Sequence, residues 1–136
     1  MLFPKPQRFS RTDGMYDARA LAPCASLPEF YRAHRDEVLR EEMPHAEEYT
    51  LTVDASGVRM TAGDDAGAFR ALTSLRQLLT EHEGRLPLCE IRDWPDFRQR
   101  GYMLDISRGR MPRPETLRAL VDLLAELKYN EFQLYM

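Results

Sequence analysis

The segment from residue 102 to the end of the chain limits the fold most strongly, because its pattern changes from strand to helix and back. Residues 102–106 form a nearly continuous apolar run, which is typical of a strand buried on both faces. Two prolines then open a helix that extends to about residue 127, and we expect Asn130 to close it in the left-handed conformation. Residues 132–136 alternate as a second strand. Strand, helix and strand at this spacing form a βαβ unit with parallel strands.

The segment up to residue 92 carries different signals, namely capping and turn residues between short periodic runs. Its pattern predicts an α+β fold, in which an antiparallel sheet carries two helices on one face. We therefore expect two domains, over residues 1–92 and 93–136. In chain order the first contains an extended edge segment over 4–16, a helix over 27–42 behind a capping box at Ser26 and Glu29, a hairpin turned at Asp54–Gly57, a helix capped by Asp64 or Asp65 that ends at Gly84, and a strand over 87–91.

Composition excludes several classes of protein. The chain has 136 residues, of which 43% are hydrophobic and 30% charged, as expected of a globular protein. Its net charge of -3 argues against a general nucleic-acid binder. We find neither an apolar run that could span a membrane nor the start of a secretory signal, so we expect a cytoplasmic protein.

The cysteine and histidine residues do not predict a metal site. Cys24 and Cys89 match no metal-binding spacing, and we expect reduced thiols, with one disulfide as the alternative. His34, His45 and His82 are scattered along the chain. We therefore expect no metal and no cofactor.

Polar residues at the end of the buried strand are the candidates for a binding site. Asp105, Ser107 and Arg108 follow its carboxyl end, where ligands bind in α/β folds. Surface arginines such as the neighbouring ones are usually solvated or paired. The alternative function is a stand-alone binding module that uses the stripe from Arg92 to Arg113 on nucleic acid or an acidic partner. A purely structural domain is a third alternative. We interpret the acidic cluster of Glu41, Glu42, Glu47 and Glu48 as a solvated helix end.

Three segments resemble one enzyme family. Residues 91–108, which contain Asp93-Trp94-Pro95-Asp96-Phe97 and then Arg-Gly-x-x-Leu-Asp-x-Ser-Arg from Arg100 to Arg108, resemble the entry to the catalytic barrel of glycoside hydrolase family 20, the β-N-acetylhexosaminidases. Residues 123–135 are similar to the following helix and second barrel strand. Residues 67–79 are similar to a helix of the family's non-catalytic α+β domain.

The resemblance implies roles for individual residues. Arg100 matches the arginine that holds hydroxyls of the terminal sugar, and Asp105 and Arg108 match positions that shape the sugar site. Gly109, Gln133 and Tyr135 stand where many members of the family have histidine. These departures suggest a divergent subgroup.

The resemblance also implies what the chain lacks. The family's adjacent Asp-Glu pair lies much further along, and a full (β/α)8 barrel needs about 250 residues. We therefore expect the N-terminal portion of a retaining enzyme that removes terminal N-acetylhexosamine from glycans by a substrate-assisted mechanism. We therefore expect none of the catalytic residues to lie within this chain. The chain should be inactive alone and should self-associate through its incomplete βαβ unit.

Overall fold

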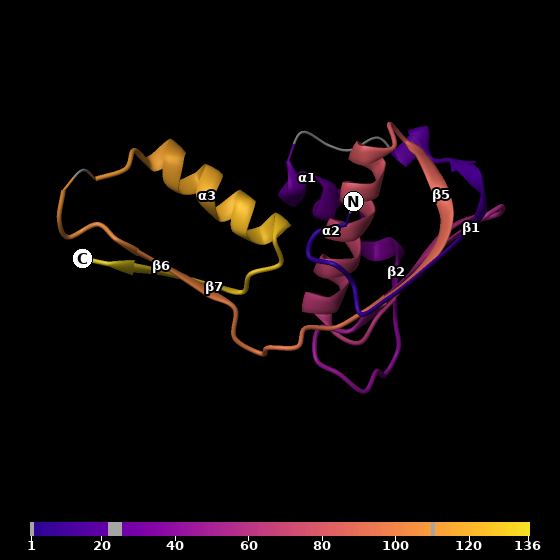
Figure 1. The fold of residues 1–136 in the computed structure, drawn as a ribbon, viewed down its shortest axis with the longest axis horizontal. Coiled ribbons are helices and arrows are strands. Elements are labelled where there is room, and N and C mark those ends of the chain that lie inside the picture. Colours follow the sequence, from indigo (N-terminus) through magenta and orange to yellow (C-terminus); the bar gives the residue numbers. More distant parts are fainter. Residues whose placement is uncertain (1, 22–25, 110) are drawn as a thin grey trace. The chain divides into compact units, whose positions relative to one another are not determined.

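The computed structural model describes residues 2–21, 26–109 and 111–136. The chain divides into two compact units, Met1–Asp96 and Phe97–Met136 (Figure 1). The helix and strand content is a mixture of α and β, as the sequence predicts.

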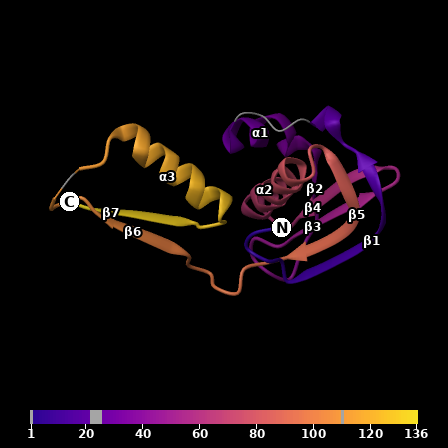
Figure 2. The same ribbon diagram turned by 45° about the horizontal axis from the view of Figure 1, so that its top comes forward.

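The first unit is a five-stranded sheet with helices on one side (Figure 2). Its strands lie in the order β1-β5-β3-β4-β2. In chain order its elements are β1 (Arg8–Asp17), the short helix η1 (Arg19–Leu21), α1 (Leu27–His34), the short helix η2 (Arg35–Glu37), β2 (Val38–Arg40), β3 (Tyr49–Asp54), β4 (Gly57–Ala62), α2 (Asp65–Glu81) and β5 (Arg85–Asp93).

The hairpin and the second helix confirm the sequence prediction. β3 and β4 pair in antiparallel fashion, and the Asp54 carboxylate accepts the backbone N–H of Ser56 at 2.8 Å in the turn. Asp64 caps α2 by accepting the N–H of Gly67 at 2.6 Å. These features are predictable because each depends on residues within a few positions of one another.

The core of the first unit lies between the sheet and α2. α2 packs across β3, β4 and β5, and α1 packs along α2. Leucine side chains of α2 meet alternate residues of β3 and β5, so the helical and strand periods bury one shared face. The largest fully buried apolar side chains of this core are Phe30, Tyr49, Leu51, Leu72, Leu75, Leu79, Leu86 and Ile91.

The expected helix over 27–42 is wrong in its second half. α1 begins after the Ser26 capping box as predicted but ends at His34, and Val38–Arg40 form strand β2. β2 pairs in parallel with β4, opposite Met60–Ala62, so the sheet is mixed and not wholly antiparallel. Val38 is buried while Leu39 is 58% exposed, the alternation of a strand. Pairing with the open edge of β4 outweighs the local helical spacing.

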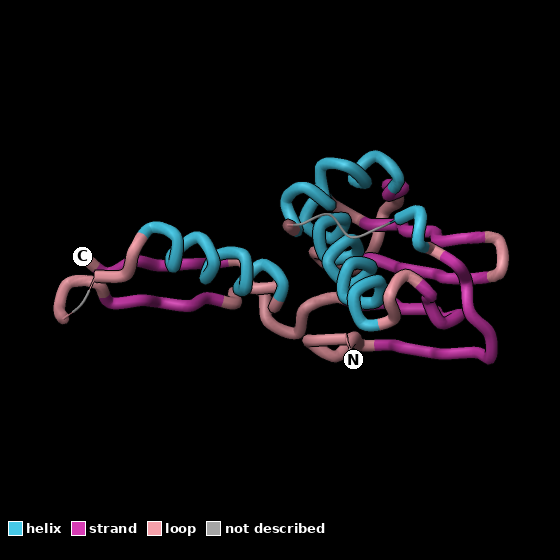
Figure 3. The backbone as a smooth tube through the Cα atoms, turned by 90° about the horizontal axis from the view of Figure 1, so that it is seen from above, coloured by secondary structure: helices cyan, strands magenta, loops and turns pink. Residues whose placement is uncertain are grey.

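The second unit is a βαβ segment (Figure 3). β6 (Gly101–Asp105) and β7 (Glu131–Tyr135) pair in parallel, joined by α3 (Pro114–Glu126). The left-handed residue after α3 is Lys128, with φ 61°, and not Asn130 as the sequence suggested.

β6 is not buried on both faces in this chain. Met103 is 61% exposed, and Leu124 is the buried apolar side chain among the described residues of α3. The apolar sequence of β6 therefore exceeds what α3 alone covers. No helix within the described ranges is long and apolar enough to cross a membrane.

Candidate functional site

The carboxyl end of β6 carries Asp105 in a tight polar turn. The Asp105 Oδ1 atom accepts the backbone N–H of Ser107 at 2.8 Å and its hydroxyl at 2.5 Å. These two hydrogen bonds, the hydroxyl first, lower the pKa of the Asp105 carboxyl below its ordinary value of 3.8. Asp105 is therefore an exposed carboxylate at neutral pH, held in one orientation.

Arg108 and Gly109 follow in the same turn. The Arg108 side chain is exposed. Gly109 has φ 76°, and a Cβ atom built there would meet nothing within 4 Å. Histidine at this position would fit the space but would strain the backbone, which gives a conformational reason for the glycine.

β7 ends beside this turn. Tyr135 lies opposite Asp105 in the parallel pair, and its carbonyl accepts the N–H of Ile106 at 2.9 Å. Asp105, Ser107, Arg108 and Tyr135 thus come together at the carboxyl edge of the two strands. This edge is where ligands bind in parallel sheets.

Arg100 lies at the opposite end of β6. Its Nε atom donates to the carbonyl of Lys128 at 2.9 Å, and its Nη1 atom donates to the carbonyl of Phe97 at 2.8 Å. At about 3.3 Å per residue, five residues of strand put the Cα atom of Arg100 about 16 Å from the Cα atom of Asp105. The structure therefore does not bring the three sequence-predicted site residues together.

Asn130 completes the connection at the amino end of the strands. Its Oδ1 atom accepts the backbone N–H of Arg100 at 2.8 Å, and its Nδ2 atom donates to the carbonyl of Arg98 at 2.7 Å. Arg98, Gln99, Asn130 and Glu131 line an open depression there. A role for Asn130 across the strands has no signal in local sequence, because its partners lie 30 and 32 residues away.

A buried carboxylate supports the segment that leads out of the first unit. Glu48 is 0% exposed, and its two oxygens bind Arg92 Nε at 2.6 Å and His45 Nδ1 at 2.7 Å. Burial alone would raise the pKa of Glu48, but the hydrogen bonds from His45 and Arg92 hold it below its ordinary value. Trp94 stacks on His45 with the ring centres 4.4 Å apart.

A second buried group fixes Asp93. The Tyr49 hydroxyl donates to Asp93 Oδ2 at 3.1 Å and lies 2.6 Å from the hydroxyl of Ser74. Burial, together with the charge of Asp93, raises the pKa of Tyr49 well above its ordinary value. Gln7 binds the other oxygen of Asp93 through its N–H at 3.1 Å. The segment from Asp93 to Asp96 is thus anchored to the sheet.

These contacts correct two sequence interpretations. The acidic cluster is solvated only in part: Glu41 and Glu42 are exposed, whereas Glu48 is buried and Glu47 accepts from Arg70 Nε at 3.0 Å. The arginine stripe is not uniformly available to a partner, because Arg92 and Arg100 are engaged within their own units.

Cys89 is a buried, free thiol, and burial raises its pKa. Cys24 lies outside the described residues. Among the residues that the structure describes, no three His, Cys, Asp or Glu side chains are grouped to hold a metal ion.

Residues 19–94 match the family described as glycosyl hydrolase family 20, domain 2. The β-hexosaminidase of Vibrio furnissii is 31% identical in an alignment that covers 99% of this chain and 26% of that protein. The β-hexosaminidase of Vibrio vulnificus is 35% identical over 65% of this chain.

Solved structures give the same result. A glycoside hydrolase family 20 β-N-acetylglucosaminidase superposes with a TM-score of 0.76 at 31% identity, over 98% of this chain and 28% of that one. The exo-β-N-acetylglucosaminidase of Vibrio harveyi, solved with N-acetylglucosamine, gives a TM-score of 0.75 at 27% identity. The chain spans only 10% and 26% of the lengths of the V. vulnificus and V. furnissii relatives. By sequence and by structure, this chain belongs to glycoside hydrolase family 20.

Proposed function

We propose that this chain supplies the accessory α+β domain and the first βαβ unit of the (β/α)8 barrel of a β-N-acetylhexosaminidase. The parallel pair of β6 and β7 carries this proposal, because its Asp-x-Ser-Arg turn lies at the carboxyl end of the first strand. Active sites of such barrels lie at that end of the strands. The family relationship supports the same assignment. We propose residues 1–92 as the accessory domain and 93–136 as the start of the barrel, a few residues before the compact units divide at Asp96.

The proposed substrate of the parent enzyme is a glycan that ends in N-acetylhexosamine. The reaction would retain configuration, with the oxygen of the substrate's acetamido group attacking the anomeric carbon. No cofactor enters this scheme. Catalytic acid chemistry would come from residues beyond those of this chain.

Within the chain we assign sugar contact to Asp105 and Arg108. A guanidinium fork suits two adjacent hydroxyls, and the exposed Arg108 follows the strand end where the substrate would lie. Arg100 we assign to positioning, because its guanidinium is bonded to two carbonyls at the other end of β6. Sugar contact by Arg100, which the family resemblance implies, is the alternative to this assignment.

We propose that the 136 residues alone have no hexosaminidase activity. The adjacent pair Asp36–Glu37 lies in η2 of the first unit, so it does not supply the barrel's acid pair. We do not favour the nucleic-acid alternative, since Arg92 neutralises the buried Glu48.

We further propose that the chain self-associates through its βαβ unit. Met103, Val121, Leu123 and Tyr135 are between 46% and 61% exposed, which is costly for large apolar side chains. Light scattering over a concentration series should show association, and a monomer at high concentration would contradict it.

We keep the cytoplasm as the proposed compartment, and two titratable thiols in the unfolded protein would support it.

A chimera tests the proposed function. Residues 1–136 would replace the aligned segment of the V. furnissii β-hexosaminidase, which matches this chain over 99% of its length. We expect the folded chimera to release 4-nitrophenol from 4-nitrophenyl N-acetyl-β-glucosaminide, whereas the 136-residue chain should release none. A chimera with a cooperative melting transition and no activity would contradict the proposal.

A further inference from the structure

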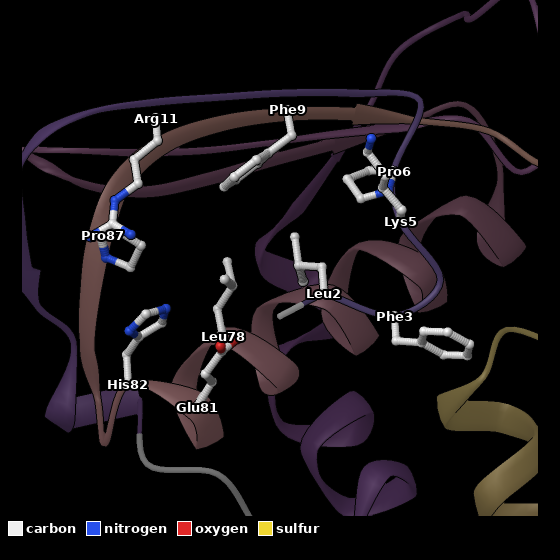
Figure 4. A pocket seen from close by; sticks show the side chains of 10 residues that line it. All are labelled: Leu2, Phe3, Lys5, Pro6, Phe9, Arg11, Leu78, Glu81, His82 and Pro87. Carbon is white, nitrogen blue, oxygen red and sulfur yellow. The ribbon is translucent and has the colours of Figure 1, made fainter.

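The first unit contains a cavity of about 480 Å³ beside the carboxyl end of α2 (Figure 4). In Figure 4, Phe9 and Arg11 extend from β1 toward Leu78 of α2 and toward His82, which follows the helix. This volume lies within the range of small-molecule sites, about 300–1,000 Å³. The cavity belongs to the accessory domain and contains none of the residues assigned to the sugar site.

The topology explains why the cavity forms. α2 packs on β3, β4 and β5, whereas β1 extends the sheet beyond the helix as an edge strand. The segment before β1 covers the gap in part. The side-chain amide of Gln77 holds that segment, accepting the N–H of Phe3 at 3.1 Å and donating to its carbonyl at 2.8 Å. The cavity therefore has a third wall that is tied to α2.

The lining combines an apolar interior with an excess of positive charge. Leu2, Phe9, Leu78 and Pro87 give apolar surface, and Phe9 remains 48% exposed. Lys5 and Arg11 are cationic, whereas Glu81 is the acidic residue of the lining.

His82 adds a polar group to the same lining. Burial, with the charge of Arg11, lowers the pKa of His82 below 6.5. His82 is therefore neutral at pH 7 and can offer a hydrogen bond there.

We propose that this cavity binds a medium-chain acyl carboxylate. Its hydrocarbon tail would lie among Leu2, Phe9 and Leu78, and its carboxylate would pair with Arg11. Charge complementarity favours an anion over a neutral ligand, since an uncharged occupant would desolvate Arg11 without pairing it. The hydrocarbon tail of the ligand provides the affinity, because each buried methylene strengthens binding about fourfold.

Calorimetric titration of the 136-residue protein with octanoate, decanoate and dodecanoate, each below its micelle concentration, tests this. We expect saturable one-to-one binding that tightens about fifteenfold for each added pair of methylenes. Arg11→Gln should weaken decanoate binding about tenfold or more and leave decanol binding unchanged. Arg8→Gln is the matched control, because Arg8 lies on the same strand but outside the cavity.

Phe9→Ala should weaken decanoate and decanol alike, whereas Met15→Ala, on the same strand and outside the lining, should change neither. Thermal melting of each variant establishes that it is folded. The proposal is overturned by an absence of saturable binding, by equal effects of Arg11→Gln and Arg8→Gln, or by Phe9→Ala turning a dimer into a monomer. That last outcome would mean that a second copy of the chain occupies the cavity.

Discussion

Arg100 and Asp105 lie at opposite ends of strand β6, and their side chains make different kinds of contact. Arg100 binds the carbonyls of Phe97 and Lys128, whereas Asp105 orders the turn that carries Arg108. One sequence motif thus spans an arginine bound to backbone carbonyls at one end and an ordered polar turn at the other.

Arg100→Ala should destabilise the second unit. It removes two charge-assisted hydrogen bonds to backbone carbonyls, together worth about 1.5–3 kcal/mol. Amide hydrogen exchange over residues 97–136 should accelerate while exchange in β3 and β5 is unchanged. Arg118→Ala, an exposed change on α3, should have no such effect. Unchanged exchange in Arg100→Ala would contradict the positioning role.

Tyr49→Phe should lower the stability of the first unit by about 1–3 kcal/mol, because Ser74 and the buried Asp93 each lose a partner. Urea unfolding followed by circular dichroism measures this. Tyr31→Phe serves as the control, since its ring packs on Phe69 at the half-buried surface of α1. Equal stability of the two variants would show that the Tyr49 hydroxyl is unimportant.

Glu48→Gln should change how stability depends on pH. The pKa of Glu48 is depressed in the fold below its ordinary 4.5, so its hydrogen bonds with Arg92 and His45 stabilise the protein above about pH 4.5. That stabilisation is lost as the pH falls through the lower folded pKa. The melting temperature of Glu48→Gln should therefore be lower than wild type at pH 7, and the difference should shrink in acid. The exposed control Glu42→Gln should follow the wild-type curve, and a difference that grows in acid would contradict this account.

Gly67→Ala should destabilise α2 although alanine is the better helix former. A Cβ atom at this position would lie 2.5 Å from the carbonyl oxygen of Glu48, which is backbone and cannot move aside cheaply. We expect a loss of at least about 1 kcal/mol in urea unfolding, within the range for overpacking. Gly109→Ala, which meets nothing within 4 Å, should cost only its backbone strain. A Gly67→Ala protein as stable as wild type would refute the close contact.

The sequence predicts those elements whose determinants are local. The Asp54–Gly57 turn and the Asp64 cap follow from neighbouring residues, and the spacing of residues 102–136 is enough to predict parallel strands. The residues from Val38 to Arg40 were misassigned because their conformation is set by β4, about twenty residues away.

The placement of Asp105 and Arg108 at the end of β6 was predictable for the same reason, because they follow an apolar strand. The engagement of Arg100 with Lys128 and Asn130, and the burial of Glu48 against Arg92, depend on partners 28 to 44 residues away. A motif shows which residues occur together but not which distant groups each one binds.

The central claim is that Arg108, and not Arg100, contacts the sugar. The kinetics of Arg108→Ala and Arg100→Ala in the V. furnissii chimera test it most directly. Arg108→Ala should reduce kcat/KM about 100-fold at an unchanged melting temperature, as expected for the loss of hydrogen bonds from a guanidinium. Arg100→Ala should lower the melting temperature while the folded fraction keeps kcat/KM within a few fold. Loss of kcat/KM in a fully stable Arg100→Ala chimera, with Arg108→Ala still active, would contradict the account.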